Sequence, residues 1–193
     1  MGDLFDFSWH SIAFILITML WWLEFRIFPS TGSRRQDAGS QSFKFILGAI
    51  LTTILISIIF AIIDFGVITG FPGRIIQMLG IVLYSFGLVL RYWCSYLLGI
   101  YFTRDIAVQE GQELVSSGPY RILRHPLYLG LLLLTLGVPL YFGSLPGLFL
   151  GGILMPWAIR ERILTEERKL SEALGKKYTD WGKDRYRLIP FIY

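Results

Sequence analysis

The 193-residue sequence contains one cysteine, Cys94, and only two histidines, His10 and His125. A single cysteine excludes an internal disulfide and a cysteine-based metal cluster. The two histidines lie far apart, and neither belongs to a metal-ligand motif such as His-Glu-x-x-His. We therefore expect no metal centre in this chain.

Charged residues are also scarce, at 17% of the sequence against 54% hydrophobic residues. This balance, with a mean hydropathy of +0.56, is too apolar for an ordinary soluble domain. Apolar runs near 20 residues long predict an all-α integral membrane protein with one domain over residues 1–193. The net charge of +4 then reflects membrane topology, and we expect no nucleic-acid partner.

The apolar runs predict about five transmembrane helices, three of them within residues 1–102. We expect spans over residues 8–28, 45–63 and 75–96, a fourth from about residue 127, and a fifth over 145–159. Residues 141–147 predict a tight turn between the last two spans, which should pair as a helical hairpin.

Three charged residues lie within these spans. Glu24 and Arg26 end the first span, where water is expected to begin. Arg91 lies inside the third span, so it must either emerge into the headgroups or find a buried partner. The first span lacks a basic leader and a small-residue cleavage site, so we expect it to be retained and not removed as a signal peptide.

Basic residues predict the orientation. With the N-terminus outside, only Arg74 of the 18 Lys and Arg residues falls outside the cytoplasmic segments. The segment 103–128 and the C-terminal tail would then share the cytoplasmic side. The membrane would be the inner membrane of a prokaryote or the endoplasmic reticulum of a eukaryote, and the sequence leaves the oligomeric state open.

A polar segment, residues 103–117, precedes a dense motif over residues 118–130. Residues 106–115 suggest a short extended hairpin around Glu110 and Gly111. In the motif, Gly118 permits a turn, Pro126 suits a helix start, and His125 and Tyr128 supply polar groups. By residue type alone, the motif fits a functional site and a purely structural turn at the membrane interface equally well.

The C-terminal tail continues a helical pattern beyond residue 159. Arg162 and Glu166 lie one turn apart and project from the same face. Such a pair is more often a solvent-exposed ion pair, worth about 0.3 to 0.5 kcal/mol, than a functional pair.

The order of these motifs resembles the isoprenylcysteine carboxyl methyltransferase family and the related phospholipid methyltransferases. The resemblance covers residues 103–190. Its pieces are Gly-x-Tyr and Arg-His-Pro-x-Tyr over 118–128, Glu-Glu-x-x-Leu from Glu166, Gly-x-x-Tyr-x-x-Trp from Gly175, and Arg-x-x-Pro from Arg187. Trp181 stands where the family commonly has Tyr, and Leu127 replaces a frequent small residue. The first 100 residues match only as hydrophobic spans.

The resemblance implies a membrane enzyme that uses S-adenosylmethionine, with residues 103–193 as the catalytic half. It implies a cytoplasmic cofactor site built from the loop before the fourth span and from the helical tail. Arg162 corresponds to a residue that contacts substrate. The implied cofactor residues are Gln109, Gln112, Glu113, Leu114, Val115, Tyr120, His125, Pro126, Leu127, Tyr128 and Glu166.

The resemblance also implies that the methyl acceptor is lipophilic and comes from the bilayer. The planar fork of Arg162 would orient a carboxylate, which is already ionised at neutral pH and needs no general base. An amine acceptor would need a base, for which Glu167 and His125 are the candidates. Three alternatives remain: a phospholipid or small-lipid N- or O-methyltransferase, a sterol-type NADPH reductase, and a channel, transporter or scaffold.

Overall fold

The computed structural model describes residues 9–28, 37–103 and 113–193. These residues form α1 (Trp9–Ile27), α2 (Asp37–Ile62), α3 (Gly70–Leu98), α4 (Pro126–Tyr141), α5 (Leu145–Leu174) and α6 (Lys176–Gly182). Two short 3-10 turns, η1 (Gly99–Tyr101) and η2 (Gly118–Arg121), lie between α3 and α4. No strand longer than an isolated bridge occurs in the described ranges, so the all-helical prediction is confirmed for them.

The long helices coincide with the predicted apolar runs. Over the described residues, α1, the segment Gln41–Ile62 of α2 and Gly70–Tyr101 are long and apolar enough to cross a membrane, and α4 is a shorter apolar helix. α5 begins as apolar as the others, but its second half is charged, and the helix continues without a break to Leu174. The structure thus supports a membrane protein with three long candidate spans, and the count of five spans stays a prediction.

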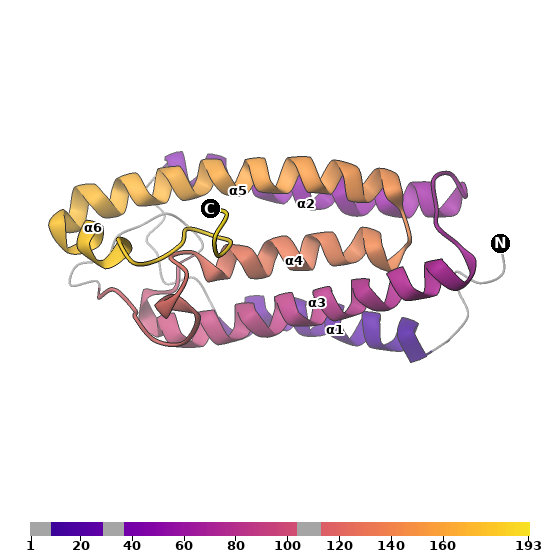
Figure 1. Cartoon of the computed structure of the whole chain (residues 1–193), viewed down its shortest axis with the longest axis horizontal. Helices are drawn as coiled ribbons and strands as arrows, with labels where there is room; N and C mark the ends of the chain where they lie inside the picture. Colours follow the sequence, from indigo (N-terminus) through magenta and orange to yellow (C-terminus); the bar gives the residue numbers. More distant parts are fainter. Residues whose placement is uncertain (1–8, 29–36, 104–112) are drawn as a thin grey trace.

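The helices run side by side in a long bundle (Figure 1). α4 packs against both α3 and α5, and α2 packs against α5 and α4. The Ser144 side chain caps α5 by accepting a hydrogen bond from the Gly147 amide. The predicted α4–α5 hairpin is therefore present, with its turn at the end opposite α6 (Figure 1).

Glycines let α3 and α4 approach closely. A side chain at Gly87 of α3 would meet the Gly130 carbonyl oxygen of α4 at 2.6 Å, and one at Gly137 would meet the Gly80 carbonyl oxygen at 2.9 Å. Small residues are favoured at such helix contacts in membranes because dispersion and not water exclusion holds the helices together. This contact fixes the first turn of α4 beside the last turns of α3.

The structure shows how the charge of Arg91 within the third span is accommodated. Its guanidinium is buried and donates to both carboxylate oxygens of Glu24 on α1, at 2.9 and 2.5 Å. Glu24 has no exposed surface, so its carboxylate does not reach out to water as the sequence suggested, while its depth in the membrane stays a prediction. The buried partner that Arg91 requires is supplied by the first span.

The C-terminal residues after α6 fold back along the segment before α4. The Tyr186 amide donates to the Ile122 carbonyl, and the Arg124 and His125 amides donate to the carbonyls of Tyr186 and Arg187, at 2.8 to 3.0 Å. These bonds hold the start of α4 against the tail. As a result α3, η2, α4, α5 and α6 all contribute to one end of the bundle (Figure 1).

Candidate active site

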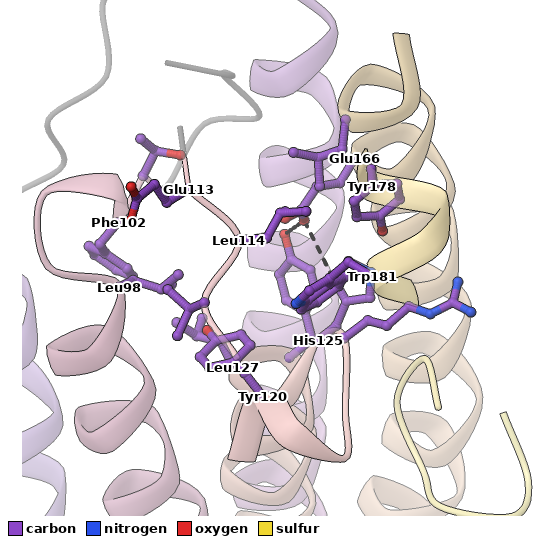
Figure 2. A pocket seen from close by; sticks show the side chains of 15 residues that line it. Leu98, Phe102, Glu113, Leu114, Tyr120, His125, Leu127, Glu166, Tyr178 and Trp181 are labelled. Carbon is purple, nitrogen blue, oxygen red and sulfur yellow. Dashed lines mark hydrogen bonds and ion pairs between the residues drawn. The ribbon is translucent and has the colours of Figure 1, made fainter. Parts of the chain in front are cut away.

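A pocket opens at that end of the bundle, with an empty volume of about 670 Å³ that includes its open mouth. Figure 2 shows Leu98, Phe102 and Glu113 on one side of the pocket, and Glu166, Tyr178 and Trp181 on the other. Its lining is Leu98, Phe102, Thr103, Glu113, Leu114, Val115, Tyr120, Arg124, His125, Leu127, Tyr128, Glu166, Leu170, Tyr178 and Trp181.

The floor is formed by η2 and the first turn of α4. Gly118 begins η2 with φ of +54°, a conformation that a side chain would disfavour. Pro126 opens α4 and is fully buried, at a position where its missing N–H costs no hydrogen bond. The turn and the helix start that the sequence predicted are both confirmed, and they direct Tyr120, His125 and Tyr128 into the pocket.

A chain of hydrogen bonds joins α5 to the pocket floor. The Tyr128 hydroxyl donates to Oε2 of Glu166 at 2.6 Å and accepts from Nε of Arg162 at 2.9 Å. Arg162 is only 4% exposed, so the alternative of a solvent-exposed ion pair is wrong. Tyr128 thus stands between the Arg162 side chain, which does not line the pocket, and the Glu166 side chain, which does.

Glu167 lies behind the wall of the pocket at the centre of a cluster of basic side chains. Its Oε1 accepts from Arg124 Nη1 at 3.2 Å and lies 3.4 Å from His125 Nε2, and its Oε2 accepts from Arg187 at 3.0 Å. Burial alone would raise the pKa of this carboxyl, but the hydrogen bond and charge of His125 and the charges of Arg187 and Arg124 lower it from 4.5 to about 2. Such a carboxylate accepts a proton poorly at neutral pH, which argues against Glu167 as a general base.

The cluster also fixes His125. The ring stacks on Tyr128 with centroids 5.7 Å apart and planes inclined by 25°, and Nδ1 lies 3.9 Å from Oε2 of Glu166. One carboxylate therefore faces each ring nitrogen, Glu167 from behind the wall and Glu166 from the pocket. This arrangement leaves the imidazole little freedom to turn.

The pocket brings together most of the predicted cofactor residues. Glu113, Leu114, Val115, Tyr120, His125, Leu127, Tyr128 and Glu166 line it. Three predicted residues do not line the pocket. Pro126 is the first residue of α4, and the side chains of Arg162 and Glu167 lie behind the pocket wall. Gln109 and Gln112 fall outside the described residues, as does most of the predicted hairpin, and the described end of that segment, residues 113–116, contains no strand.

Several lining residues were not predicted from the sequence. Leu98, Phe102 and Thr103 follow the third span and carry no motif, so only the packing of α3 against α4 brings them here. Tyr178 and Trp181 belong to the tail motif that carried the resemblance, and that motif was the signal for them. Leu170 lies one turn after Glu166 on α5, and this helical spacing could have placed it beside the pocket.

The mixed lining suits a ligand that is partly polar and partly flat. Apolar and aromatic groups come from the α3 end and from α6, while two tyrosine hydroxyls, an imidazole and two carboxylates come from the segment before η2, from η2, from the start of α4 and from α5. Burial raises the pKa of the Tyr120 hydroxyl well above its usual value, so it stays neutral at physiological pH. In the described part of the chain, no three His, Cys, Asp or Glu side chains gather as metal ligands would, and the expectation of no metal stays a prediction.

Fold and pocket together define a helical membrane protein with a partly polar pocket at one end of its bundle. The sequence model of the phospholipid methyltransferase family matches residues 75–177, more than half of the chain. The chain belongs to this family. The match covers α3, α4 and α5 and with them most of the pocket, and it favours a methyltransferase over the reductase, channel and scaffold alternatives.

Individual relatives agree with the family match. The chain is 28% identical over 119 residues to a protein-S-isoprenylcysteine O-methyltransferase B of Arabidopsis thaliana, covering 61% of this chain and 60% of the relative. It is 29% identical over 120 residues to a Xenopus laevis protein-S-isoprenylcysteine O-methyltransferase, covering 61% and 41%. It is 34% identical over 84 residues to the uncharacterized protein YpbQ of Bacillus subtilis, covering 44% and 50%. The matches therefore span about half the length of these relatives.

Proposed function

We propose that this protein transfers a methyl group from S-adenosylmethionine to a lipophilic acceptor at the membrane. The acceptor that the site suits best is the carboxylate of an isoprenylcysteine or of a similar lipid-linked acid. The carrying observation is that a membrane methyltransferase family matches the helices that build the pocket, and that the names of several relatives specify a prenylated cysteine.

The residues present fit the cofactor. The pocket offers aromatic and apolar walls for a purine, and Glu166 offers an anionic partner for an ammonium or for ribose hydroxyls. The rest of the cofactor would be enclosed by Glu113, Leu114, Val115, Tyr120, His125, Leu127 and Tyr128. Pro126 would position these side chains by starting α4, and Gln109 and Gln112 stay candidates for cofactor binding. S-adenosylmethionine would supply a methyl group on a sulfonium; the nucleophile would take this methyl group as the carbon–sulfur bond breaks, and S-adenosylhomocysteine would leave as a neutral thioether, which requires no metal.

Arg162 would orient the acceptor. Its guanidinium is held by Tyr128, whose hydroxyl also binds Glu166, so the acceptor residue and the cofactor residue share one partner. Because a guanidinium binds a carboxylate through two parallel hydrogen bonds, Arg162 would direct one carboxylate oxygen toward the pocket. Positioning and exclusion of water would then provide the rate enhancement, since a carboxylate needs no base.

An amine acceptor is the second candidate, because the matching family is named for phospholipids. An amine must lose a proton before or after transfer. Glu167 is unsuited to take it because three basic groups stabilise its ionised form, which would leave His125 as the base. The carboxylate acceptor therefore fits this site better.

We extend the proposal to the membrane. Five spans, α1 to α5, would place the pocket and the basic residues that surround it on the cytoplasmic side. Arg124, Arg185 and Arg187 all lie at the pocket end, which supports that orientation. The soluble cofactor would reach the pocket from the cytoplasm, and the acceptor would arrive from the bilayer beside α4 and α5.

The test uses radiolabelled S-adenosylmethionine with purified protein in lipid vesicles. We expect base-labile methyl label, the mark of an ester, on an S-prenylated cysteine with a free carboxylate, and none on the same compound with an amidated carboxylate. We expect Arg162→Ala to lower turnover at least about 100-fold and to change cofactor affinity, measured by titration calorimetry, by less than about 3-fold. Stable label on phosphatidylethanolamine instead would replace the carboxylate with the amine acceptor, and binding of NADPH but not S-adenosylmethionine would contradict the proposed function.

A further inference from the structure

Tyr178 on α6 carries a buried hydroxyl group in the pocket wall. Its side chain is only 4% exposed and lines the pocket beside Glu166 (Figure 2). Among the residues that the structure describes, no group meets hydrogen-bond geometry with its hydroxyl. A buried hydroxyl without a partner costs free energy, so such a group in a pocket wall indicates a ligand atom as its partner.

The polar group of the fold that acts most strongly on the Tyr178 hydroxyl is the Glu167 carboxylate, although the two do not meet hydrogen-bond geometry. Burial, and then the charges of Glu167 and Glu166, raise the pKa of Tyr178, which keeps its hydroxyl protonated and able to donate. However, both oxygens of Glu167 already accept from basic side chains, Oε1 from Arg124 and Oε2 from Arg187. Any contact of Tyr178 with this carboxylate is therefore a weak addition to a satisfied acceptor.

The wall around Tyr178 is already in place. Its ring stacks on Trp181 with centroids 5.8 Å apart and planes 27° from parallel. Trp181 is held in turn by a 2.8 Å hydrogen bond from its indole to the Ser116 hydroxyl and by the Arg185 guanidinium 4.6 Å from its ring. The aromatic pair thus forms a fixed face of the pocket that joins α6 to the segment before η2.

We propose that Tyr178 is a further cofactor-contacting residue, whose hydroxyl donates a hydrogen bond to an uncharged acceptor atom of the nucleoside. The inference rests on the proposed function and adds a residue to its site. An uncharged acceptor in the ribose or the purine fits better than the cofactor carboxylate, because the Glu166 carboxylate lines the pocket on the same side as Tyr178. Trp181 acts beside it as a packing surface for the same part of the ligand.

The experiment compares Tyr178→Phe with wild type by titration calorimetry. The ligands are S-adenosylmethionine, S-adenosylhomocysteine and 5′-methylthioadenosine, which lacks the amino-acid end. We expect the variant to bind all three about 3- to 10-fold more weakly, as the loss of one uncharged hydrogen bond predicts. The melting temperature without ligand should stay the same or rise, because the variant removes an unpaired buried hydroxyl.

Tyr141→Phe is the matched control, because its hydroxyl lies at the other end of α4, 3.4 Å from Ser11, and should leave all three affinities unchanged. A lower melting temperature for Tyr178→Phe with unchanged affinities would assign the hydroxyl to a structural bond with Glu167 and overturn the proposal. A loss seen with S-adenosylmethionine but not with 5′-methylthioadenosine would overturn the nucleoside assignment. If wild type bound none of the three ligands, the proposed function would fail together with this inference.

Discussion

Arg91 on α3 and Glu24 on α1 form a buried ion pair in which two guanidinium nitrogens bind the two carboxylate oxygens. The same guanidinium reaches the Leu127 carbonyl oxygen in the first turn of α4, at 3.5 Å. The Arg91 guanidinium therefore contacts α1 and α4 as well as belonging to α3. Because Leu127 adjoins Tyr128, the pair holds the floor of the pocket without lining it.

Removing one member of this pair should destabilise the protein strongly. Glu24→Gln leaves Arg91 as a buried charge without its counter-charge, and we expect a loss of about 3 to 5 kcal/mol in the free energy of unfolding. Glu24→Leu combined with Arg91→Met should recover most of it, since an apolar pair carries no desolvation cost. Denaturant titration in detergent measures both, with the exposed pair Arg160 and Glu161 as a control whose disruption should cost less than about 1 kcal/mol. A single variant as stable as the control would show that the pair is dispensable.

Glu167 should make the free energy of unfolding depend on pH below about 4.5. Its folded pKa of about 2 lies below the unfolded value of 4.5, so its contribution is complete above pH 4.5 and is lost as the pH falls toward 2. The shift corresponds to roughly 3 kcal/mol at neutral pH. We expect Glu167→Gln to melt lower than wild type at pH 7 and to approach it as the pH falls from 4.5 to 3. Melting curves that stay parallel over this range would contradict the ion cluster.

Tyr128 should couple acceptor positioning to cofactor binding. Tyr128→Phe removes a hydroxyl that both accepts from Arg162 and donates to Glu166. Hydrogen bonds to charged groups contribute about 1.5 to 3 kcal/mol, so we expect turnover to fall about 10- to 100-fold and cofactor affinity to fall as well. Steady-state kinetics with titration calorimetry separates the two effects. Loss of affinity alone, with normal turnover at saturating cofactor, would remove Tyr128 from the link to Arg162.

The close contact of α3 with α4 should not tolerate a methyl group. Gly87→Ala would place its Cβ 2.6 Å from the Gly130 carbonyl oxygen, so the helices must separate, at a cost of about 1 to 3 kcal/mol. Gly152→Ala on α5 is the matched control, because nothing lies within 4 Å of its new methyl group and alanine favours a helix. Thermal unfolding in detergent compares them. Equal stability of the two variants would mean that the bundle is looser at this contact than the structure has it.

Much of the fold follows from local sequence. The apolar runs placed α1 to α4 within a few residues of their ends, apart from longer starts to α2 and α3, because hydropathy and helix formation depend on neighbours in the chain. The Gly118 turn, the Pro126 helix start and the α4–α5 hairpin were predicted for the same reason. The motifs near Tyr128 and Glu166 also sufficed to predict that these two side chains share a site, and their 2.6 Å hydrogen bond agrees.

The environments of individual charges were decided only by the tertiary structure. Sequence placed Glu24 close to water, helical spacing alone favoured an exposed Arg162, and Glu167 was a candidate base for an amine acceptor. The folded chain buries the first two and surrounds the third with basic groups. Leu98 and Phe102 line the pocket although no sequence motif predicted them. The physical reason is the same in each case. An apolar run is a property of consecutive residues, but the burial and pKa of a side chain depend on groups far away in the chain, such as Glu24 and Arg91, which are 67 positions apart and which only the packing of helices brings together.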